Sequence, residues 1–405
     1  AQRTLSLEVV GFRVTRRVVT ILDAPLSGVT LTSQGETFVT GADGTFTLSG
    51  LSVPYDLSVF DTDADWAHVY EGLTASELLL APPGTGLLTP MFTAAAVIGD
   101  LVGGVVPLLD NHVVYVCAEG LDAVAFGCGM VGPGEKAYAV GVSWLGGSSR
   151  QIRLHALEIA FNASGLPFAY PGYGTVELTV TDDMNVPADV DIDLGGPLAS
   201  SSVHVDIDTP LTVIETVAAA QLGPNLLVKL FSVLADTTSL DVLMPVIDGV
   251  SYTFVAEAGA DQFGWTSGVT GASTTVKVPA PATLTEPAAF ATGVTTATTF
   301  SIGTVGGAPV TYVWTLGNTG LNMAVTTTAT SHTIPDPAAF GLTLPPDAFS
   351  SWQVYVHPGP DVESGTYHVG DAFRLNRLGA FGMSQGLVGD GLLLPSADGF
   401  FTTAP

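Results

Sequence analysis

The stretch Gly41-Ala42-Asp43-Gly44-Thr45-Phe46-Thr47-Leu48-Ser49-Gly50-Leu51, followed by Tyr55 and Leu57, decides the fold of this 405-residue chain. Its Asp-Gly pair marks a tight turn, and the residues after the turn alternate between apolar and polar. A second turn at Gly50-Leu51 leads into another alternating segment. Short strands separated by tight turns are typical of a small β-sandwich, so the stretch predicts an architecture and no chemistry.

Together with the upstream segment Ala24-Pro25-Leu26-Ser27-Gly28-Val29-Thr30-Leu31, this stretch resembles the carboxypeptidase regulatory-like domain. That family is a transthyretin-like β-sandwich found as a module in many secreted bacterial proteins. The resemblance covers about residues 1–85 and rests on the Asp-Gly pair, on Phe46 two residues later, and on the Gly-Leu before Tyr55. It implies a scaffold, because in the carboxypeptidases the module accompanies a separate zinc peptidase domain.

The rest of the chain continues the strand pattern, so we expect an all-β protein made of serial β-sandwiches, the first transthyretin-like and the others Ig-like or fibronectin III-like. A chain of 405 residues is long enough for several cores. Within the third sandwich, residues 214–234 are expected to form a short helical or irregular interruption. The predicted domains are residues 1–88, 89–194, 195–281 and 282–405, the last similar to a fibronectin type III-like sandwich.

Composition excludes several classes of protein. Charged residues are 12% of the chain and hydrophobic residues 47%, yet no apolar run approaches the roughly 20 residues of a transmembrane helix. The net charge of −27 repels phosphate backbones and anionic lipid, so we expect no nucleic-acid partner and no transmembrane segment.

The chain begins at Ala1-Gln2 without a methionine, as a mature protein does after signal-peptide removal, so we expect it outside the cell or at the cell surface. Cys117 and Cys128 flank the turn of an expected hairpin, which predicts a disulfide in an oxidising compartment. The alternative is a pair of reduced thiols.

The N-terminus differs in charge from the rest of the chain. Residues 1–17 contain four arginines and one glutamate, a net charge of +3, which leaves −30 on the remainder. Their period-two alternation predicts strands. One interpretation is that they are simply the first strands of the first domain, and the other is that the first strand adds to a sheet of a neighbouring copy. The candidate inter-subunit residues are Leu5, Leu7, Val9, Arg13, Arg16 and Arg17.

Patterns for catalysis and metal binding are few. The pair His68 and Glu71 is expected in a loop, and His155 and Glu158 lie in an expected strand, where residues three apart point to opposite faces and cannot share a metal. We therefore predict no catalytic residue and no cofactor. Calcium at domain junctions is an open alternative to solvated acidic loops. Its candidate ligands are Asp182, Asp183, Asp189, Asp191 and Asp193.

The sequence therefore predicts a secreted structural protein of the cell surface, a self-assembling subunit of an extracellular filament or sheath, with other copies of itself as partners. Envelope polysaccharide or a surface protein are the alternative partners. The second hypothesis is a carbohydrate-binding adhesin with exposed aromatic side chains, and the third is a secreted hydrolase. The aromatic residues considered for the adhesin are Trp66, Trp265, Tyr170 and Tyr173, and the alternative is that they anchor the core or loops.

Overall fold

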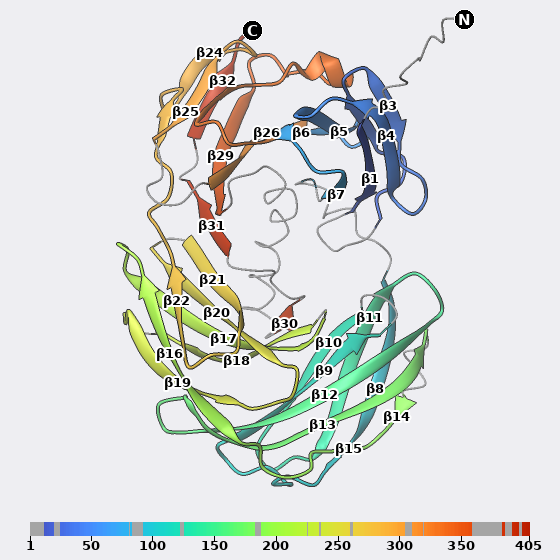
Figure 1. Cartoon of the computed structure of the whole chain (residues 1–405), viewed down its shortest axis with the longest axis vertical. Helices are drawn as coiled ribbons and strands as arrows, with labels where there is room; N and C mark the ends of the chain where they lie inside the picture. Colours follow the sequence, from blue (N-terminus) through green and yellow to red (C-terminus); the bar gives the residue numbers. More distant parts are fainter. Residues whose placement is uncertain are drawn as a thin grey trace, which may run out of the picture. The chain divides into compact units, whose positions relative to one another are not determined.

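The computed structural model covers the whole chain, and its regular structure is almost entirely β-strand (Figure 1). None of the described residues forms a helix that is long and apolar enough to cross a membrane. The described residues are 12–19, 25–80, 82, 92–121, 125–182, 188–224, 226–234, 236–259, 262–303, 310–318, 320–358, 383–384, 391–396 and 399–405.

The chain divides into two compact units, which are described separately. Unit 1 contains residues 1–88, 281–370 and 394–405, and unit 2 contains residues 89–280 and 371–393. Residues 89–280 of unit 2 are thus inserted between the first and second segments of unit 1, and residues 371–393 between the second and third. The four predicted domains are a finer division than these two units and stay a prediction.

The N-terminal part of unit 1 is a β-sandwich. One sheet has the order β4-β1-β7, and the facing strands have the order β3-β2-β5-β6. The strands are β1 (Phe12–Val18), β2 (Thr30–Ser33), β3 (Glu36–Val39), β4 (Thr45–Leu51), β5 (Tyr55–Asp61), β6 (Trp66–Leu73) and β7 (Glu77–Leu80).

The stretch that decides the fold behaves as its pattern predicts. The Asp43 carboxylate accepts hydrogen bonds from the backbone N–H and the hydroxyl of Thr45, at 3.0 and 2.7 Å. Gly44 has φ +71°, and a Cβ there would lie 2.5 Å from the Val18 carbonyl oxygen, so only glycine fits. Phe46 and Leu48 on β4 pack into the sandwich core.

The C-terminal part of unit 1 adds a second sandwich. The small sheet β23-β25-β28 faces a sheet in which β27, β26, β29, β32 and β24 are neighbours. A 3-10 turn spans Pro337–Phe340. The strands are β23 (Leu284–Glu286), β24 (Ala291–Val294), β25 (Thr299–Ile302), β26 (Val310–Asn318), β27 (Leu321–Thr327), β28 (Ser331–Thr333), β29 (Phe349–Pro358) and β32 (Gly399–Thr403).

A parallel strand pair joins the two sandwiches of unit 1. Residues 66–70 of β6 pair in register with residues 322–326 of β27, about 250 residues further along the chain. The pairing continues the sheet from β3 to β29 without a break. The first and last thirds of the chain therefore share one sheet, which we call the β6–β27 joint.

Unit 2 is built around a large antiparallel sheet of order β13-β12-β9-β10-β11-β8, with the short parallel strands β14 and β15 on β8. One face of this sheet carries an apolar cluster of buried residues, which includes Val116, Trp144 and Leu154. The strands are β8 (Phe92–Val102), β9 (His112–Gly120), β10 (Ala125–Val131), β11 (Ala137–Leu145), β12 (Ser149–Phe161), β13 (Pro167–Thr181), β14 (Ala188–Asp189) and β15 (Ile192–Asp193).

The predicted disulfide is present. Cys117 on β9 and Cys128 on β10 are directly opposite in the antiparallel register, with their Cα atoms 4.1 Å apart. The bond therefore joins two neighbouring strands of the large sheet.

The remainder of unit 2 forms the sheet β19-β16-β22 and the strands β18-β17-β20-β21, with β30 on β18 and residues 391–393 of β31 on β21. The strands are β16 (Ser200–Asp208), β17 (Val213–Gly223), β18 (Leu226–Val233), β19 (Ser239–Pro245), β20 (Ser251–Ala258), β21 (Gln262–Val269), β22 (Ser273–Lys277), β30 (Met383–Ser384) and β31 (Gly391–Pro395).

The prediction of a helical or irregular interruption over residues 214–234 is wrong. These residues form most of the hairpin of β17 and β18, paired from Thr216–Val233 to Gly223–Leu226. The run Ala218-Ala219-Ala220 favours helix in isolation, but all three residues are buried between β18 and β20. Tertiary packing overrides the local propensity.

Candidate functional site

The predicted inter-subunit residues fall into two groups. Leu5, Leu7 and Val9 lie outside the described residues. Arg13, Arg16 and Arg17 lie on β1, which pairs with β4 on one edge and with β7 on the other. Because both edges of β1 are occupied at residues 15–17, where the arginines Arg16 and Arg17 lie, addition of this chain's N-terminal strand to another sheet would have to involve residues before that point.

The aromatic residues considered for an adhesin do not form a binding surface. Trp66, Trp265 and Tyr170 are 4%, 1% and 1% exposed, so of the two alternatives the structure supports anchoring in the interior for them. Tyr173 is half-buried, and its hydroxyl lies 2.8 Å from His155 Nδ1. A sugar ring needs an accessible ring face, and burial removes that face from the first three.

The two His-x-x-Glu pairs are split by the fold. His68 and Glu71 lie on strand β6, and the expectation of a loop is wrong. His68 is fully buried and contacts Thr326 Oγ1 at 2.7 Å, whereas Glu71 contacts His332. His155 and Glu158 lie on opposite faces of β12, as predicted: the former contacts Glu119 and the latter contacts His112.

Unit 2 therefore contains two buried His-Glu pairs. His112 Nδ1 lies 2.6 Å from Glu158 Oε1, and the second oxygen of this carboxylate accepts a hydrogen bond from the Val105 backbone N–H at 3.2 Å. His155 Nε2 lies 3.2 Å from Glu119 Oε2. In both pairs the carboxylate is at most 2% exposed, so each pair links strands β9 and β12 by a contact in the interior.

The His155 pair extends into a longer polar network. Arg153 contacts the Glu119 carboxylate at 3.8 Å and the exposed Glu177 at 2.5 Å, and burial raises the pKa of Tyr173 to about 12. A Cβ on Gly223 of β17 would lie 2.0 Å from Glu119 Oε1, so the β17–β18 hairpin closes over this carboxylate. Strand β17 thus covers the Glu119 carboxylate, and the network links β9, β12 and β13.

The calcium candidates have other roles where they are described. Asp191 Oδ1 accepts a hydrogen bond from the Asp100 backbone N–H, and Asp193 Oδ1 accepts one from Gly195 N–H. Asp182 and Asp189 are exposed, and Asp183 lies outside the described residues. Within the described part of the chain, no group of three or more His, Cys, Asp or Glu side chains is placed to hold a metal ion.

Among the described residues, an exposed aromatic cluster lies in the C-terminal sandwich. Phe290 stacks on Phe400 with ring centroids 5.8 Å apart and planes 15° apart, and Phe349 stacks on Phe400 at 5.5 Å and 10°. Phe290 and Phe349 are 67% and 60% exposed. We call these three residues the phenylalanine row. It crosses three neighbouring strands, because Phe290 precedes β24, Phe400 lies on β32 and Phe349 begins β29.

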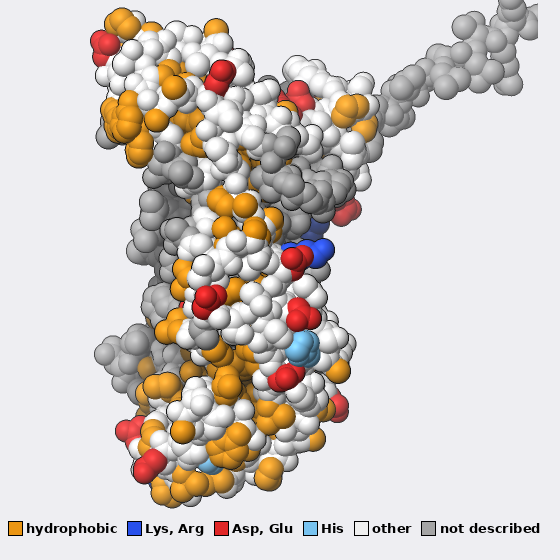
Figure 2. All heavy atoms as spheres, turned by 90° about the vertical axis from the view of Figure 1, so that its left-hand side faces the viewer, with side chains coloured by type: hydrophobic (Ala, Val, Ile, Leu, Met, Phe, Trp, Pro, Cys, Tyr) orange, Lys and Arg blue, Asp and Glu red, His pale blue; other side chains and the backbone are white. Residues whose placement is uncertain are grey.

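Strand periodicity explains why Phe400 faces outward. Its neighbour Phe401 is fully buried and packs edge-on against Phe300 at 5.6 Å. Successive side chains of a strand point to opposite faces, so one ring of the pair enters the core and the other joins the row. Figure 2 shows hydrophobic side chains gathered on the surface of the part of unit 1 that carries β24 and β32, towards the top of the view.

The backbone holds the row in place. Phe290 has φ +61°, a left-handed conformation that costs a bulky residue about 1–3 kcal/mol, and its N–H donates to the Phe400 carbonyl at 2.7 Å. The Thr403 hydroxyl accepts a hydrogen bond from Ala348 N–H at 2.8 Å and donates to the Pro345 carbonyl at 2.6 Å. The segment that leads into Phe349 is therefore fixed to the end of β32.

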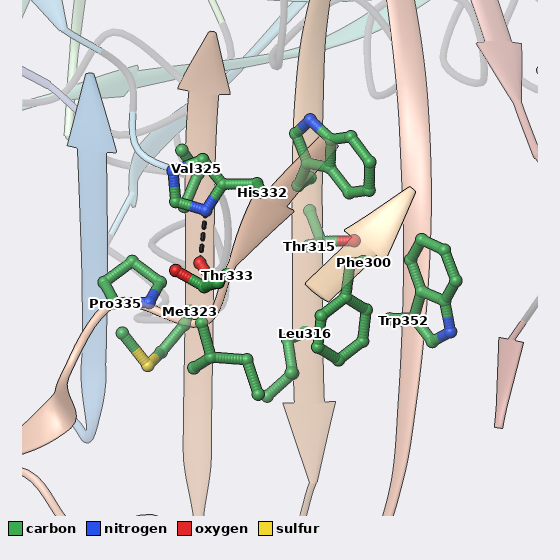
Figure 3. A pocket seen from close by; sticks show the side chains of 11 residues that line it. Phe300, Thr315, Leu316, Met323, Val325, His332, Thr333, Pro335 and Trp352 are labelled. Atoms are coloured by element: carbon green, nitrogen blue, oxygen red, sulfur yellow. Dashed lines mark hydrogen bonds between the residues drawn. The ribbon is translucent and has the colours of Figure 1, made fainter. Parts of the chain in front are cut away.

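A second apolar feature of unit 1 is a pocket between its two C-terminal sheets (Figure 3). The empty space of this pocket is about 350 Å³, a volume that includes the solvent at its open mouth. The indole rings of Trp314 and Trp352 stack at 5.8 Å with planes 3° apart, and Phe300 meets Trp352 edge-on at 5.0 Å. The lining is almost wholly apolar and is completed by Leu316, Met323, Val325, Ile334 and Pro335.

His332 lies at this pocket and connects it to β6. Its Nε2 lies 2.7 Å from Glu71 Oε1, and its Nδ1 contacts the Thr333 carbonyl (Figure 3). Partial burial acts to lower the pKa of His332, but the hydrogen bond and the charge of Glu71 outweigh it and raise the pKa. The hydrogen bond from His332 lowers the pKa of Glu71 against the effect of burial. This ion pair ties β28 to the β6–β27 joint.

Comparisons with known proteins give no family. No family model matches the chain, and no curated protein matches it. Among solved structures, the Bacillus anthracis TIE protein is 9% identical over 66% of this chain and 50% of its own, with a TM-score of 0.16. This chain thus spans about half of that protein's length.

Two other solved structures have TM-scores close to that of the first. The fimbrial anchor protein Mfa2 from Porphyromonas gingivalis is 11% identical over 44% of this chain and 80% of its own, with a TM-score of 0.17. Two B repeat units of the collagen-binding protein of Staphylococcus aureus are 12% identical over 85% of this chain and 93% of their own, with a TM-score of 0.17. Such values are too low to transfer a function or a partner.

Proposed function

We propose that the chain is a secreted structural protein of the cell surface that assembles with other copies of itself through its N-terminal segment. The observation that carries this proposal is the contrast between residues 1–17, with a net charge of +3, and the rest of the chain, with −30. Copies with an acidic body repel one another, and Arg3 together with the arginines of β1 is where such a body is attracted.

The surrounding structure supports the same proposal. A cross-strand disulfide between Cys117 and Cys128 fits an oxidising compartment outside the cytosol. An all-β scaffold closed by the β6–β27 joint is a rigid platform for a docking segment. The segment before β1 alternates between apolar and polar at Leu5, Leu7 and Val9, as a strand does when it adds to another molecule.

The test compares the chain with a variant that lacks residues 1–11 and keeps β1 intact. Light scattering and negative-stain electron microscopy at physiological salt should show ordered assemblies for the first and a monomer for the second. The matched control is L5S/L7S/V9S, which keeps the length and the charge of the segment but removes its apolar side chains, and it should also stay monomeric. A full-length chain that is monomeric at all concentrations would refute the proposal.

A further inference from the structure

The tip of the hairpin between β12 and β13 carries a sequence that the proposed assembly does not use, Asn162-Ala163-Ser164. An asparagine followed two residues later by serine or threonine, with any residue but proline between them, is the acceptor sequence for N-linked glycosylation. The chain has seven asparagines, and Asn162 alone stands in such a sequence. The place of Asn162 in the fold therefore decides whether this sequence is open to modification.

The acceptor sequence lies outside the packed part of the hairpin. The strand pairing ends at Phe161 and Pro167, and the four residues that follow Phe161 are all exposed. The Asn162 N–H donates to the Leu166 carbonyl at 2.9 Å, and the Gly165 N–H donates to the Asn162 carbonyl at 2.9 Å, which closes the turn. Acceptor asparagines of exported proteins lie in surface loops, and this hairpin tip is such a place.

The side chain of Asn162 keeps its amide nitrogen available for a new bond. Its Oδ1 accepts hydrogen bonds from the backbone N–H of Ser164 at 2.9 Å and from that of Leu166 at 3.1 Å. Because both partners are donors, the carbonyl oxygen and not the amide group faces the turn. Nδ2 has no hydrogen-bond partner among the described residues. A sugar attached to Nδ2 therefore leaves both hydrogen bonds of the turn in place.

The hairpin itself is uncharged and exposes apolar side chains. In a chain of net charge −27, residues 159–176 carry no charged side chain. Phe168 on the returning strand β13 is 50% exposed, and Leu109 is 53% exposed. The turn after Leu109 is tied to the hairpin, because the Phe161 N–H donates to the Asn111 carbonyl at 2.9 Å and Asn111 Nδ2 donates to the Phe161 carbonyl at 3.0 Å. A hydrophilic oligosaccharide at the tip supplies polar cover where the hairpin has no charge of its own.

We propose that Asn162 is the attachment site of an N-linked oligosaccharide. The donor is an oligosaccharide carried on a lipid diphosphate, and the enzyme is an oligosaccharyltransferase that acts outside the cytosol. The step forms the bond between Asn162 Nδ2 and C1 of the first sugar and breaks the bond between that C1 and the diphosphate. One amide proton passes to a base of the enzyme, and the lipid diphosphate leaves. This inference rests on the part of the proposed function that places the chain outside the cytosol, which the disulfide between Cys117 and Cys128 fits.

The test is mass spectrometry of the full chain, recovered from the surface or the medium of the cells that produce it. Peptide mapping should place an oligosaccharide on Asn162, and a peptide N-glycosidase should remove it and convert that residue to aspartate. Asn162→Gln removes the acceptor amide, and Ser164→Ala removes the hydroxyl but keeps the backbone N–H that bonds Asn162, so both should abolish the modification. Ser164→Thr keeps a hydroxyl and should be modified like the parent.

The matched control is Asn322→Gln. Asn322 is also exposed, but the residue two positions later is Ala324, so this variant should keep the oligosaccharide on Asn162. Circular dichroism establishes that each variant is folded, and a loss of the sugar then reports on the acceptor sequence.

The outcomes separate this inference from the proposed function. An exported chain with its disulfide formed and Asn162 unmodified overturns the inference and leaves the proposed assembly in place. A sugar that persists in Ser164→Ala also overturns it, because another sequence is then recognised. If Asn162 is modified while the chain stays monomeric at all concentrations, the inference holds and the proposed function fails. A chain that remains in the cytosol overturns both.

Discussion

Two regions of the molecule bury histidines in opposite ways. On β9 and β12 of unit 2, His112 and His155 each face a buried carboxylate, Glu158 and Glu119. In the β6–β27 joint of unit 1, His68 is fully buried with only the Thr326 hydroxyl as a hydrogen-bond partner, and its Nδ1 has none among the described residues. In unit 2 the buried histidines are thus paired with buried carboxylates. In the joint, the buried histidine has a neutral partner and itself stays neutral.

The difference follows from what each region joins. Strands β9 and β12 are neighbours over nine register positions, and their polar pairs link strands of one local sheet. The joint connects segments far apart in sequence, and the His68 ring stacks on Tyr70 with centroids 4.0 Å apart. An aromatic stack with one neutral hydrogen bond needs no compensating charge from either segment.

The largest effect is expected from the buried carboxylate of unit 2. Glu158→Ala leaves His112 and the Val105 N–H without their acceptor, and loss of one partner of a buried pair costs about 3–5 kcal/mol of unfolding free energy. Chemical denaturation measures the loss, and hydrogen exchange should localise it to β9, β12 and residues 103–106.

The matched control for this variant is Glu177→Ala on the neighbouring strand β13. Glu177 also forms an ion pair, with Arg153, but its side chain is 58% exposed, so the expected loss is below about 1 kcal/mol. Equal losses for the two variants would show that burial does not set the strength of these pairs.

A smaller and pH-dependent effect is expected at the joint. Burial lowers the pKa of His68 from 6.5 to about 3. A histidine with a depressed pKa binds more protons when unfolded, so its contribution is fully present above pH 6.5 and falls as the pH decreases toward 3. Unit 1 should lose about 2 kcal/mol of unfolding free energy between pH 6.5 and 5, at about 1.4 kcal/mol per pH unit.

Denaturation at pH 7, 6 and 5 measures this slope, and hydrogen exchange on β6 and β27 assigns it to the joint. His68→Gln removes the titrating group and should flatten the slope whatever its effect at pH 7. His332 does not confound the interval from pH 6 to 5, because its raised pKa places its own change in stability above pH 6.5. A slope that survives in His68→Gln would mean that another group titrates.

The smallest effect is expected at the partly exposed pair between Glu71 and His332. Glu71→Gln should cost less than about 1 kcal/mol at pH 6, since both side chains keep contact with solvent. The pKa of His332 is raised, so its contribution is present below pH 6.5 and disappears as the pH rises through the folded-state value. The difference between the parent and Glu71→Gln should therefore shrink at pH 9, and a double-mutant cycle with His332→Gln isolates the pair.

Local sequence signals predicted the local features. The turn at Asp43-Gly44, the strands after it and the disulfide between Cys117 and Cys128 each depend on residues close together in the chain. The failure over residues 214–234 is of the opposite kind, because an alanine run carries a helix propensity that burial between two strands overrides. The β6–β27 joint has no local signal, since neither strand specifies a partner about 250 residues away.

The phenylalanine row escaped prediction for the same reason. Phe290, Phe349 and Phe400 are separated by more than 50 residues each and meet only through the pairing of β29, β32 and β24. The aromatic residues chosen from the sequence, such as Trp66 and Trp265, belong to the interior. The adjacent pair Phe400-Phe401 was the available signal, because in a strand one of two neighbouring rings must face away from the core.

The insertion of unit 2 within unit 1 has a mechanical consequence. Both ends of the chain belong to unit 1, and the β6–β27 joint links the segment that precedes unit 2 to the segment that follows it. When the two ends are pulled apart, this row of hydrogen bonds acts as a shortcut across residues 89–280, and that segment carries no tension while the shortcut holds. The joint must therefore break before the inserted residues 89–280 can extend under load.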